Sequence, residues 1–368
     1  MGRIHNSLMM IDRAYRIYHA ERVEKEKIKE PERQRILSQV ILTPEHKKEI
    51  DNLYISTYGK KIPYDWHRLY TSYTGNFDAR YIPELLFIPH IQERFVSQSS
   101  IDILSDKNLL PFLVNGISGV RTPSVFFSCE DGHFRDQEMN LLSRKDAVHY
   151  LWNLGECFAK PTKDSNSGKG CRALCIRNGI DLHSGESVSS ILSSSGRNFN
   201  FQECLINVNS IKCLHPDSIN TFRITSYIWD DKICFFPLVL RIGRGRNAVD
   251  NAHQGGMFIG VSDQGQLNKY AFTEFQERFE VHPDSGVVFM GHTIPEVPGI
   301  LQAIRILHGR LAQIGMISWD ITVDENGFVV VVEMNLDGQA IWVSQMANGK
   351  GAFGENTEAI LRWISKKR

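Results

Sequence analysis

Residues 319–335 carry the sequence WDITVDENGFVVVVEMN, in which two strand-like runs flank the dipeptide Asn326-Gly327. An Asn-Gly pair between two such runs is the strongest short-range signal of a β-hairpin. We therefore predict two antiparallel strands joined by a two-residue type I′ turn, in which Glu325 pairs with Phe328.

This predicted hairpin brings acidic side chains together. Counting back from the turn along both strands places Asp320 directly opposite Glu333, and side-chain alternation puts Asn335 on the face of Glu333. Two carboxylates that face each other repel unless a cation lies between them, and oxygen ligands without His or Cys suit Mg²⁺. We predict a magnesium site here; the alternative is a hairpin whose polar face meets water.

A second segment combines a lysine with a Gly/Ser-rich loop. A predicted strand ends at Lys160-Pro161, and residues 164–170 then read DSNSGKG before another apolar strand. Glycine lets backbone N–H groups approach phosphate oxygens, and Lys160 could add a point charge. The pattern is neither a P-loop nor a kinase Gly-rich loop, and taken alone a plain hairpin turn explains it as well.

The composition excludes several classes of function. Lys plus Arg and Asp plus Glu number 42 each in 368 residues, so no overall field favours nucleic acid or an anionic membrane surface. The apolar runs are too short for a membrane span and no signal-peptide pattern opens the chain, which favours a cytoplasmic protein. The seven cysteines lack CxxC spacing, which is typical of reduced thiols.

The remaining pattern predicts a helical, aromatic-rich lobe over residues 1–100, followed by a strand-rich region. Predicted helices cover 102–114, 143–152, 298–313 and 356–367, and predicted strands cover 124–127, 156–161, 172–177, 200–206, 221–229, 232–242, 314–323 and 328–335. Between them, Arg241, Arg244 and Arg246 suit a loop that closes over phosphates, although a solvated basic loop explains them equally. The segment at Glu203 could present an edge to adenine and a carboxylate to ribose, although a generic strand has the same pattern.

Taken together, these segments resemble the ATP-grasp superfamily, and more narrowly the sugar-transfer associated ATP-grasp proteins, over roughly residues 100 to 345. The matching pieces are Asp106-Lys107-Asn108, 119–123, Lys160-Pro161 with 165–170, Gln202-Glu203, His215-Pro216 with Asn220 and Arg223, 249–251 with 255–256, His282-Pro283 with Gly286, and Trp319-Asp320 with 333–335. The N-terminal lobe departs from the Rossmann-like domain that often opens such enzymes.

The resemblance implies an α+β ATP-grasp fold with a helix-rich N-terminal lobe, in which two α+β subdomains sandwich ATP. We expect the N-terminal lobe at residues 1–100, a subdomain with the phosphate loop at 101–205, and a subdomain with the metal site at 206–368. The residues that the resemblance implies at the site are Lys107 and Lys160 on phosphates, Ser165, Ser167, Gly168, Lys169 and Gly170 as the covering loop, Gln202, Glu203 and Leu205 at the adenine, Asp320, Glu333 and Asn335 on Mg²⁺, and Arg223 as a catalytic cation. From the residue pattern we expect Arg241 as a second catalytic cation.

The resemblance also implies a function. Family members chiefly join a carboxylate to an amine through an acyl phosphate, so we expect an ATP- and Mg²⁺-dependent ligase, with a sugar acid or an amino acid of surface-polysaccharide assembly as one class of substrate. A kinase on the same fold is the alternative, and a non-catalytic binding module is a third. No nucleic acid or membrane span is expected, and a homodimer is left open.

Overall fold

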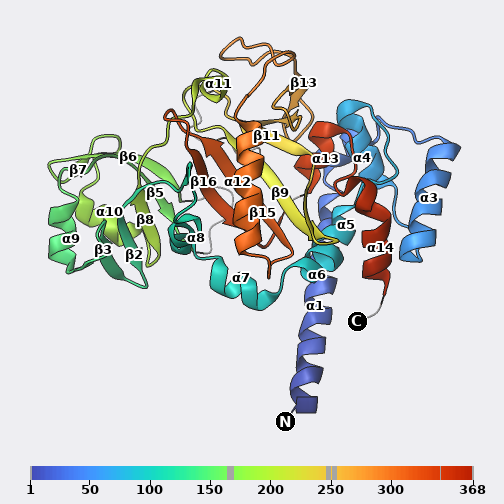
Figure 1. The fold of residues 1–368 in the computed structure, drawn as a ribbon, viewed down its shortest axis with the longest axis horizontal. Helices are drawn as coiled ribbons and strands as arrows, with labels where there is room; N and C mark the ends of the chain where they lie inside the picture. Colours follow the sequence, from blue (N-terminus) through green and yellow to red (C-terminus); the bar gives the residue numbers. More distant parts are fainter. Residues whose placement is uncertain (1, 164–169, 246–249, 251–254, 340, 367–368) are drawn as a thin grey trace.

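The computed structural model describes residues 2–163, 170–245, 250, 255–339 and 341–366 (Figure 1). Three groups of elements make up the described chain: N-terminal helices, a seven-stranded sheet and a nine-stranded sheet. Both expectations of an α+β architecture and of a helical N-terminal lobe are confirmed. None of the helices in the described part of the chain combines the length and the apolarity needed to cross a bilayer.

The N-terminal lobe consists of helices joined by loops. Its elements are α1 (Gly2–Lys27), α2 (Pro31–Leu37), α3 (Pro44–Tyr58), α4 (Asp65–Thr74), α5 (Glu84–Leu86), a π-helical turn η1 (Phe87–Gln92), α6 (Glu93–Phe95) and α7 (Gln98–Leu104). Helix α3 shows why: Thr43 accepts a hydrogen bond from the His46 amide, Pro44 occupies the first turn, and Gly59 ends the helix at φ 82°.

The predicted helix over 102–114 is interrupted in the structure. Helix α7 ends at Leu104, a 3-10 turn η2 covers Lys107–Leu109, and α8 covers Leu110–Val114. Asp106 caps η2 through the Asn108 amide, and Pro111 occupies the first turn of α8, where its missing N–H costs nothing. Because of these local start signals the apolar pattern does not form one continuous helix, and Lys107 lies in the 3-10 turn between α7 and α8.

The seven-stranded sheet is built from residues 125–202. Its strands are β2 (Val125–Glu130), β3 (His133–Asp136), β4 (Leu141–Leu142), β5 (Gly155–Pro161), β6 (Arg172–Arg177), β7 (Ile180–Asp181) and β8 (Phe199–Gln202), in the order β4-β3-β2-β8-β5-β6-β7. Helices α9 (Arg144–Tyr150) and α10 (Val188–Ser194) share a hydrophobic core with it. Strand β8 is shorter than the predicted 200–206 and stops before Glu203.

The nine-stranded sheet carries the C-terminal half. Its main path is β1 (Val120–Arg121), β16 (Val329–Asn335), β15 (Met316–Val323), β9 (Thr221–Trp229), β11 (Leu238–Ile242), β12 (Met257–Val261), β13 (Leu267–Phe272) and β14 (Arg278–Phe279), with β10 (Lys232–Phe235) paired to β9. The single strand predicted over 232–242 is divided at Pro237, which has no N–H for a ladder. Strands β12 and β13 were not predicted.

Two different layers cover the faces of this sheet. Helix α12 (Val297–Arg310) packs on the face that buries Trp319, whose indole N–H donates to Ser226, which in turn contacts His308 of α12. Helix α13 (Trp342–Asn348) packs on β11 and β12 and against α4, so α13 and the N-terminal lobe cover the part of the other face that these strands form. A short helix, α11 (Asn209–Lys212), lies between β8 and β9. The last elements are η4 (Gly354–Asn356) and α14 (Thr357–Ser365).

Candidate functional site

The hairpin of β15 and β16 has a different turn from the predicted one but the predicted pair of carboxylates. The Asp324 amide bonds to the Phe328 carbonyl, and Gly327 donates to Asp324 at a φ of 84°, so the loop has three residues and the predicted Glu325–Phe328 pair is wrong. A three-residue loop with Gly in the left-handed position is a common hairpin connection. One extra residue, Val332, then forms a bulge, and Asp320 pairs with Glu333 as predicted.

Charged side chains form a row across three neighbouring strands. Glu333 on β16 lies opposite Asp320 on β15, which lies opposite Arg223 on β9. Arg223 Nε is 2.5 Å from Asp320 Oδ1, and Arg223 Nη2 is 3.0 Å from Asp320 Oδ2. Asp320 is almost fully buried, at 4% exposure, so its charge depends on these arginine contacts.

Arg241 on β11 completes the row from the far side. Its Nη2 lies 3.2 Å from Asp320 Oδ2 and 3.6 Å from Asp250 Oδ1, and it donates to the Thr221 hydroxyl. Asp250 in turn accepts from both the amide and the hydroxyl of Thr221. Burial opposes the charge of Arg241, but the neighbouring carboxylates, Asp250 first, raise its pKa above the ordinary value. The guanidinium is thus charged and held in place.

Two lysines outside the nine-stranded sheet reach the same row: Lys107 from the turn η2 and Lys160 from the seven-stranded sheet. Lys107 Nζ lies 3.1 Å from Glu333 Oε1. Lys160, at the end of β5, directs its Nζ to the carbonyl of the bulge residue Val332 at 3.5 Å. Burial, and then the positive charge of Lys107, lower the pKa of Lys160 to about 8. An anion placed between the two lysines would remove the repulsion that lowers this pKa.

The row as a whole carries more positive than negative charge. Among the described residues, the cations are Lys107, Lys160, Arg223 and Arg241, and the carboxylates beside them are Asp250, Asp320 and Glu333. The cations also come from different parts of the fold: Lys107 belongs to the turn η2, Lys160 to the seven-stranded sheet, and the arginines to the nine-stranded sheet. A polyphosphate is the kind of ligand that such a set of cations attracts.

The donor atoms of the hairpin fit magnesium. Asp320 and Glu333 supply carboxylate oxygens, and Asn335 uses its amide N–H₂ toward the Ser318 carbonyl at 3.5 Å, which leaves its amide oxygen as the acceptor atom. Asp320 Oδ1 is buried, and although it lies 2.5 Å from Arg223 Nε, the two atoms do not have hydrogen-bond geometry. Within the described chain, no group of three or more His, Cys, Asp or Glu side chains is arranged to hold a metal ion by itself, so a metal at the hairpin would need Asn335 and phosphate oxygens, as Mg²⁺ commonly does.

The remaining predicted site residues divide into two groups. Ser165, Ser167, Gly168 and Lys169 lie outside the described residues, as does Arg246, while Gly170 is described at a φ of 82°, where a Cβ would meet the Pro161 ring at 3.0 Å. Gln202 is buried and Leu205 follows β8. The Glu203 carboxylate accepts from Ser124 N at 2.8 Å and pairs with Arg121, so this structure engages it within the protein.

Two histidines at the site were not linked by sequence reasoning. The rings of His215 and His282 lie 5.5 Å apart, and their Nε2 atoms contact the carbonyls of Gly245 and Gly243, at 3.0 and 2.9 Å. These glycines directly follow β11, which carries Arg241, so the two rings position the chain beyond the arginine. The signal that could have paired them is the tetrapeptide His-Pro-Asp-Ser, which begins at both histidines.

Comparison with known proteins identifies the family. Similar solved structures include N5-carboxyaminoimidazole synthetase from Staphylococcus aureus with ADP (14% identity over 67% of this chain and 51% of that one, TM-score 0.37) and the ATP-grasp ligase PsnB with its minimal precursor, Mg and ADP (11%, 74% and 62%, TM-score 0.41). D-alanyl-alanine synthetase A from Vibrio cholerae O1 biovar eltor also matches (9%, 70% and 61%, TM-score 0.37).

The chain spans between 51% and 62% of the lengths of these three proteins. No curated protein matches the sequence. The model of the sugar-transfer associated ATP-grasp family matches residues 90–360, which is most of the chain and includes every residue of the charged row. The predicted ATP-grasp fold is therefore confirmed, and this chain belongs to the sugar-transfer associated ATP-grasp family.

Proposed function

We propose that this protein is an ATP- and Mg²⁺-dependent ligase that joins a carboxylate to an amine through an acyl phosphate. The observation that carries the proposal is the charged row, in which Lys107 from the turn η2, Lys160 from one sheet and two arginines from the other sheet meet at two carboxylates. Phosphoryl transfer depends on positioning and on neutralising charge, and this row offers both.

Each side chain would have a distinct part. Lys107 and Lys160 would bind the phosphates, and Arg223 and Arg241 would stabilise the charge that develops during transfer. Asp320, Glu333 and Asn335 would hold Mg²⁺, which when bound neutralises phosphate oxygens and polarises the transferred group. Ion pairs with Lys107, Arg223 and Arg241 hold these two carboxylates in place within the row.

We also propose that the loop at 165–170 covers the phosphates and that Gln202, Glu203 and Leu205 border the adenine. The proposed domain boundaries lie near residues 100 and 205. Strand β1 qualifies the boundary, because residues 120–121 pair with β16 of the nine-stranded sheet. The family description favours a sugar acid or an amino-acid partner in polysaccharide assembly as substrate.

The first experiment is thermal unfolding with Mg-ATP, Mg-GTP, ATP plus EDTA, and no ligand. A ligand that binds only the folded protein raises the unfolding midpoint by mass action, so we expect a rise specific to Mg-ATP. Acid and amine pairs are then screened for release of ADP together with phosphate. ADP without free phosphate would indicate the kinase alternative, and no rise in any condition would reject the nucleotide site.

A further inference from the structure

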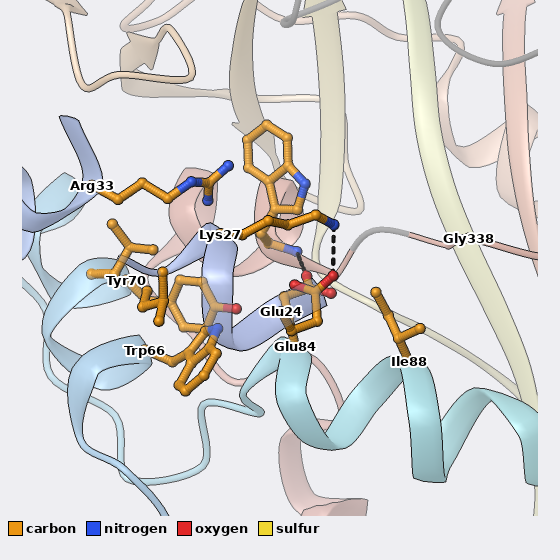
Figure 2. A pocket seen from close by; sticks show the side chains of 11 residues that line it. Glu24, Lys27, Arg33, Trp66, Tyr70, Glu84, Ile88 and Gly338 are labelled. Atoms are coloured by element: carbon orange, nitrogen blue, oxygen red, sulfur yellow. Dashed lines mark hydrogen bonds and ion pairs between the residues drawn. The ribbon is translucent and has the colours of Figure 1, made fainter. Parts of the chain in front are cut away.

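A second polar site lies in the N-terminal lobe, away from the charged row. A cavity of about 270 Å³ is enclosed by α1, α2 and α4, by α5 with η1, and by the start of α13 (Figure 2). Its polar lining consists of Glu24, Lys27, Arg33, Tyr70 and Glu84, and its walls include two indole rings, Trp66 and Trp342. The polar groups thus face a partly aromatic space.

Two buried carboxyl groups in this cavity share one cation. Glu24 and Glu84 are 4% and 6% exposed. Lys27 Nζ contacts Glu24 Oε1 at 2.6 Å, whereas Glu84 Oε1 accepts the amides of Ile341 and Trp342, at 3.1 and 2.9 Å. The cavity therefore lacks one positive charge if both carboxyls ionise.

The other cation of the lining does not make up the difference. Arg33 forms ion pairs with Glu30 and Glu274, both at 3.0 Å. Two carboxylates thus already balance its single charge. The shortfall is confined to Glu24, Glu84 and Lys27.

The Tyr70 hydroxyl is a second and independent sign of a ligand. Tyr70 is fully buried, and its hydroxyl is without a hydrogen-bond partner among the described residues. Figure 2 shows this hydroxyl directed toward the side where Glu24 and Glu84 lie. A buried hydroxyl without a partner destabilises the folded protein, so a ligand that supplies a partner would recover that loss.

We propose that this cavity binds a small organic ammonium ion. Glu24 and Glu84 would accept hydrogen bonds from the ammonium group, Tyr70 would offer its hydroxyl to a polar substituent, and the indoles of Trp66 and Trp342 would contact the carbon chain and the charge. An anion would meet two carboxyls, and a bare metal ion would meet aromatic walls instead of the oxygen ligands it needs. An ammonium ion with a short carbon chain satisfies both kinds of wall.

The titration of Glu84 agrees with this geometry. Burial, and then the adjacent Glu24 carboxylate, raise the pKa of Glu84 to about 8, against the nearby Lys27 and the two backbone amides. The other charged or titratable groups that line the cavity are Arg33 and Tyr70. Near neutral pH, Glu84 therefore holds a proton in place of the missing cation, and an ammonium ion that takes that place would displace the proton.

The cavity lies on the side of the nine-stranded sheet that carries the charged row. Val239 pairs directly with Arg223 and therefore shares its face. Val239, Phe258 and Trp342 belong to one hydrophobic cluster, and the Trp342 and Phe258 rings meet edge to face at 5.5 Å. Trp342 thus separates the cavity from the sheet face. The proposed ligand binding does not depend on the ligase activity.

The test is isothermal titration calorimetry of the full chain without nucleotide, using n-propylammonium chloride, 1-propanol and sodium propionate at pH 7. Ligands of four heavy atoms rarely bind more tightly than tens of micromolar, so we expect a Kd near or below ~1 mM for the ammonium ion. Propanol and propionate should bind at least tenfold more weakly. Titration in two buffers of different ionisation enthalpy should show release of about one proton.

Variants make the test specific to the cavity. Glu84→Gln should abolish proton release and weaken ammonium binding at least tenfold, and Tyr70→Phe, which keeps the ring, should weaken binding of ethanolammonium more than that of n-propylammonium. Glu32→Gln, on the exposed surface of α2, is the matched control and should change neither. Equal binding of propanol and propylammonium, no binding by the wild type, or unchanged binding by Glu84→Gln would overturn the proposal.

Discussion

The charged row and the N-terminal cavity use the same side chains in opposite proportions. In the row, four cations stand beside three carboxylates, and Asp320 alone contacts two arginines. In the cavity, two carboxyls share Lys27. In each site, burial and then a neighbour of like charge shift a pKa: that of Lys160 falls to about 8, and that of Glu84 rises to about 8.

The difference between the two sites indicates which ligand each would bind. Burial is the first cause of both pKa shifts, and a neighbouring group of like charge is the second. The like-charged neighbour of Lys160 is the cation Lys107, and a pair of cations suits phosphate; that of Glu84 is the carboxylate Glu24, and a pair of carboxyls suits an ammonium ion. Total charge could not show this, because the whole chain is neutral.

The largest expected effect concerns the carboxylates of the row. Asp320→Asn and Glu333→Gln should each lower Mg-ATP-dependent turnover at least ~100-fold, because each removes a metal ligand and leaves neighbouring cations unpaired. The measurement is ADP release under saturating Mg-ATP, with circular dichroism to verify folding. Glu325→Gln, exposed in the turn of the same hairpin, should retain full activity. Wild-type turnover in either core variant would remove the metal assignment.

A smaller effect is expected at Lys160. Below about pH 8 this lysine is charged and binds phosphate, and above it the charge is lost, so the Kd of the wild type for ATP should rise as pH increases from 7 to 9. Lys160→Met should raise the Kd about tenfold at pH 7 and remove this pH dependence. Fluorescence titration measures both values. Lys145→Met, on the exposed face of α9, should leave the curve unchanged; the same unchanged curve in Lys160→Met would contradict the assignment.

The smallest effect is a change of stability at the cavity. The folded state holds a proton on Glu84 up to about pH 8, whereas the unfolded state releases it near pH 4.5, so wild-type stability should fall as pH rises between these values. Glu84→Gln does not ionise and can still accept the amides of Ile341 and Trp342. Its Tm should match the wild type near pH 4.5 and exceed it by about 3–6 °C at pH 8. A constant difference across this range would mean that Glu84 does not titrate in it.

The hairpin shows how far sequence can predict this site. The alternation and the Asn-Gly dipeptide correctly predicted two strands and the Asp320–Glu333 pair. The pairing next to the turn was wrong, because two local departures, a three-residue loop and a bulge at Val332, cancel by the time the strands reach Asp320. A bulge has no composition signal of its own, so the Asp320–Glu333 pair was predicted correctly only because the two departures cancel.

The cavity lay beyond prediction for a different reason. Glu24, Tyr70, Glu84 and Trp342 come from four separate elements that no turn or register connects. Their sequence neighbourhoods resemble ordinary amphipathic helices, and the cavity forms only after α1 packs against α5 and η1 and α4 packs against α13. The ion pairs of Arg223 and Arg241 with Asp320 were hidden in the same way, since the order of β15, β9 and β11 in the sheet is not sequential.

Because of the bulge at Val332, the faces on which Asp320 and Glu333 lie depend on the number of residues in each strand of the hairpin. Without the extra residue, Glu333 would stand opposite Trp319 and enter the core under α12, while Asp320 would face a valine. A gain or loss of one residue inside either strand therefore moves one of the two carboxylates to the opposite face of the sheet, whereas a change of length in the turn at residues 325–327 leaves both on the same face. When family sequences are aligned, gaps in this hairpin belong in the turn, and a relative with an odd gap between 329 and 333 is expected to have lost the paired carboxylates.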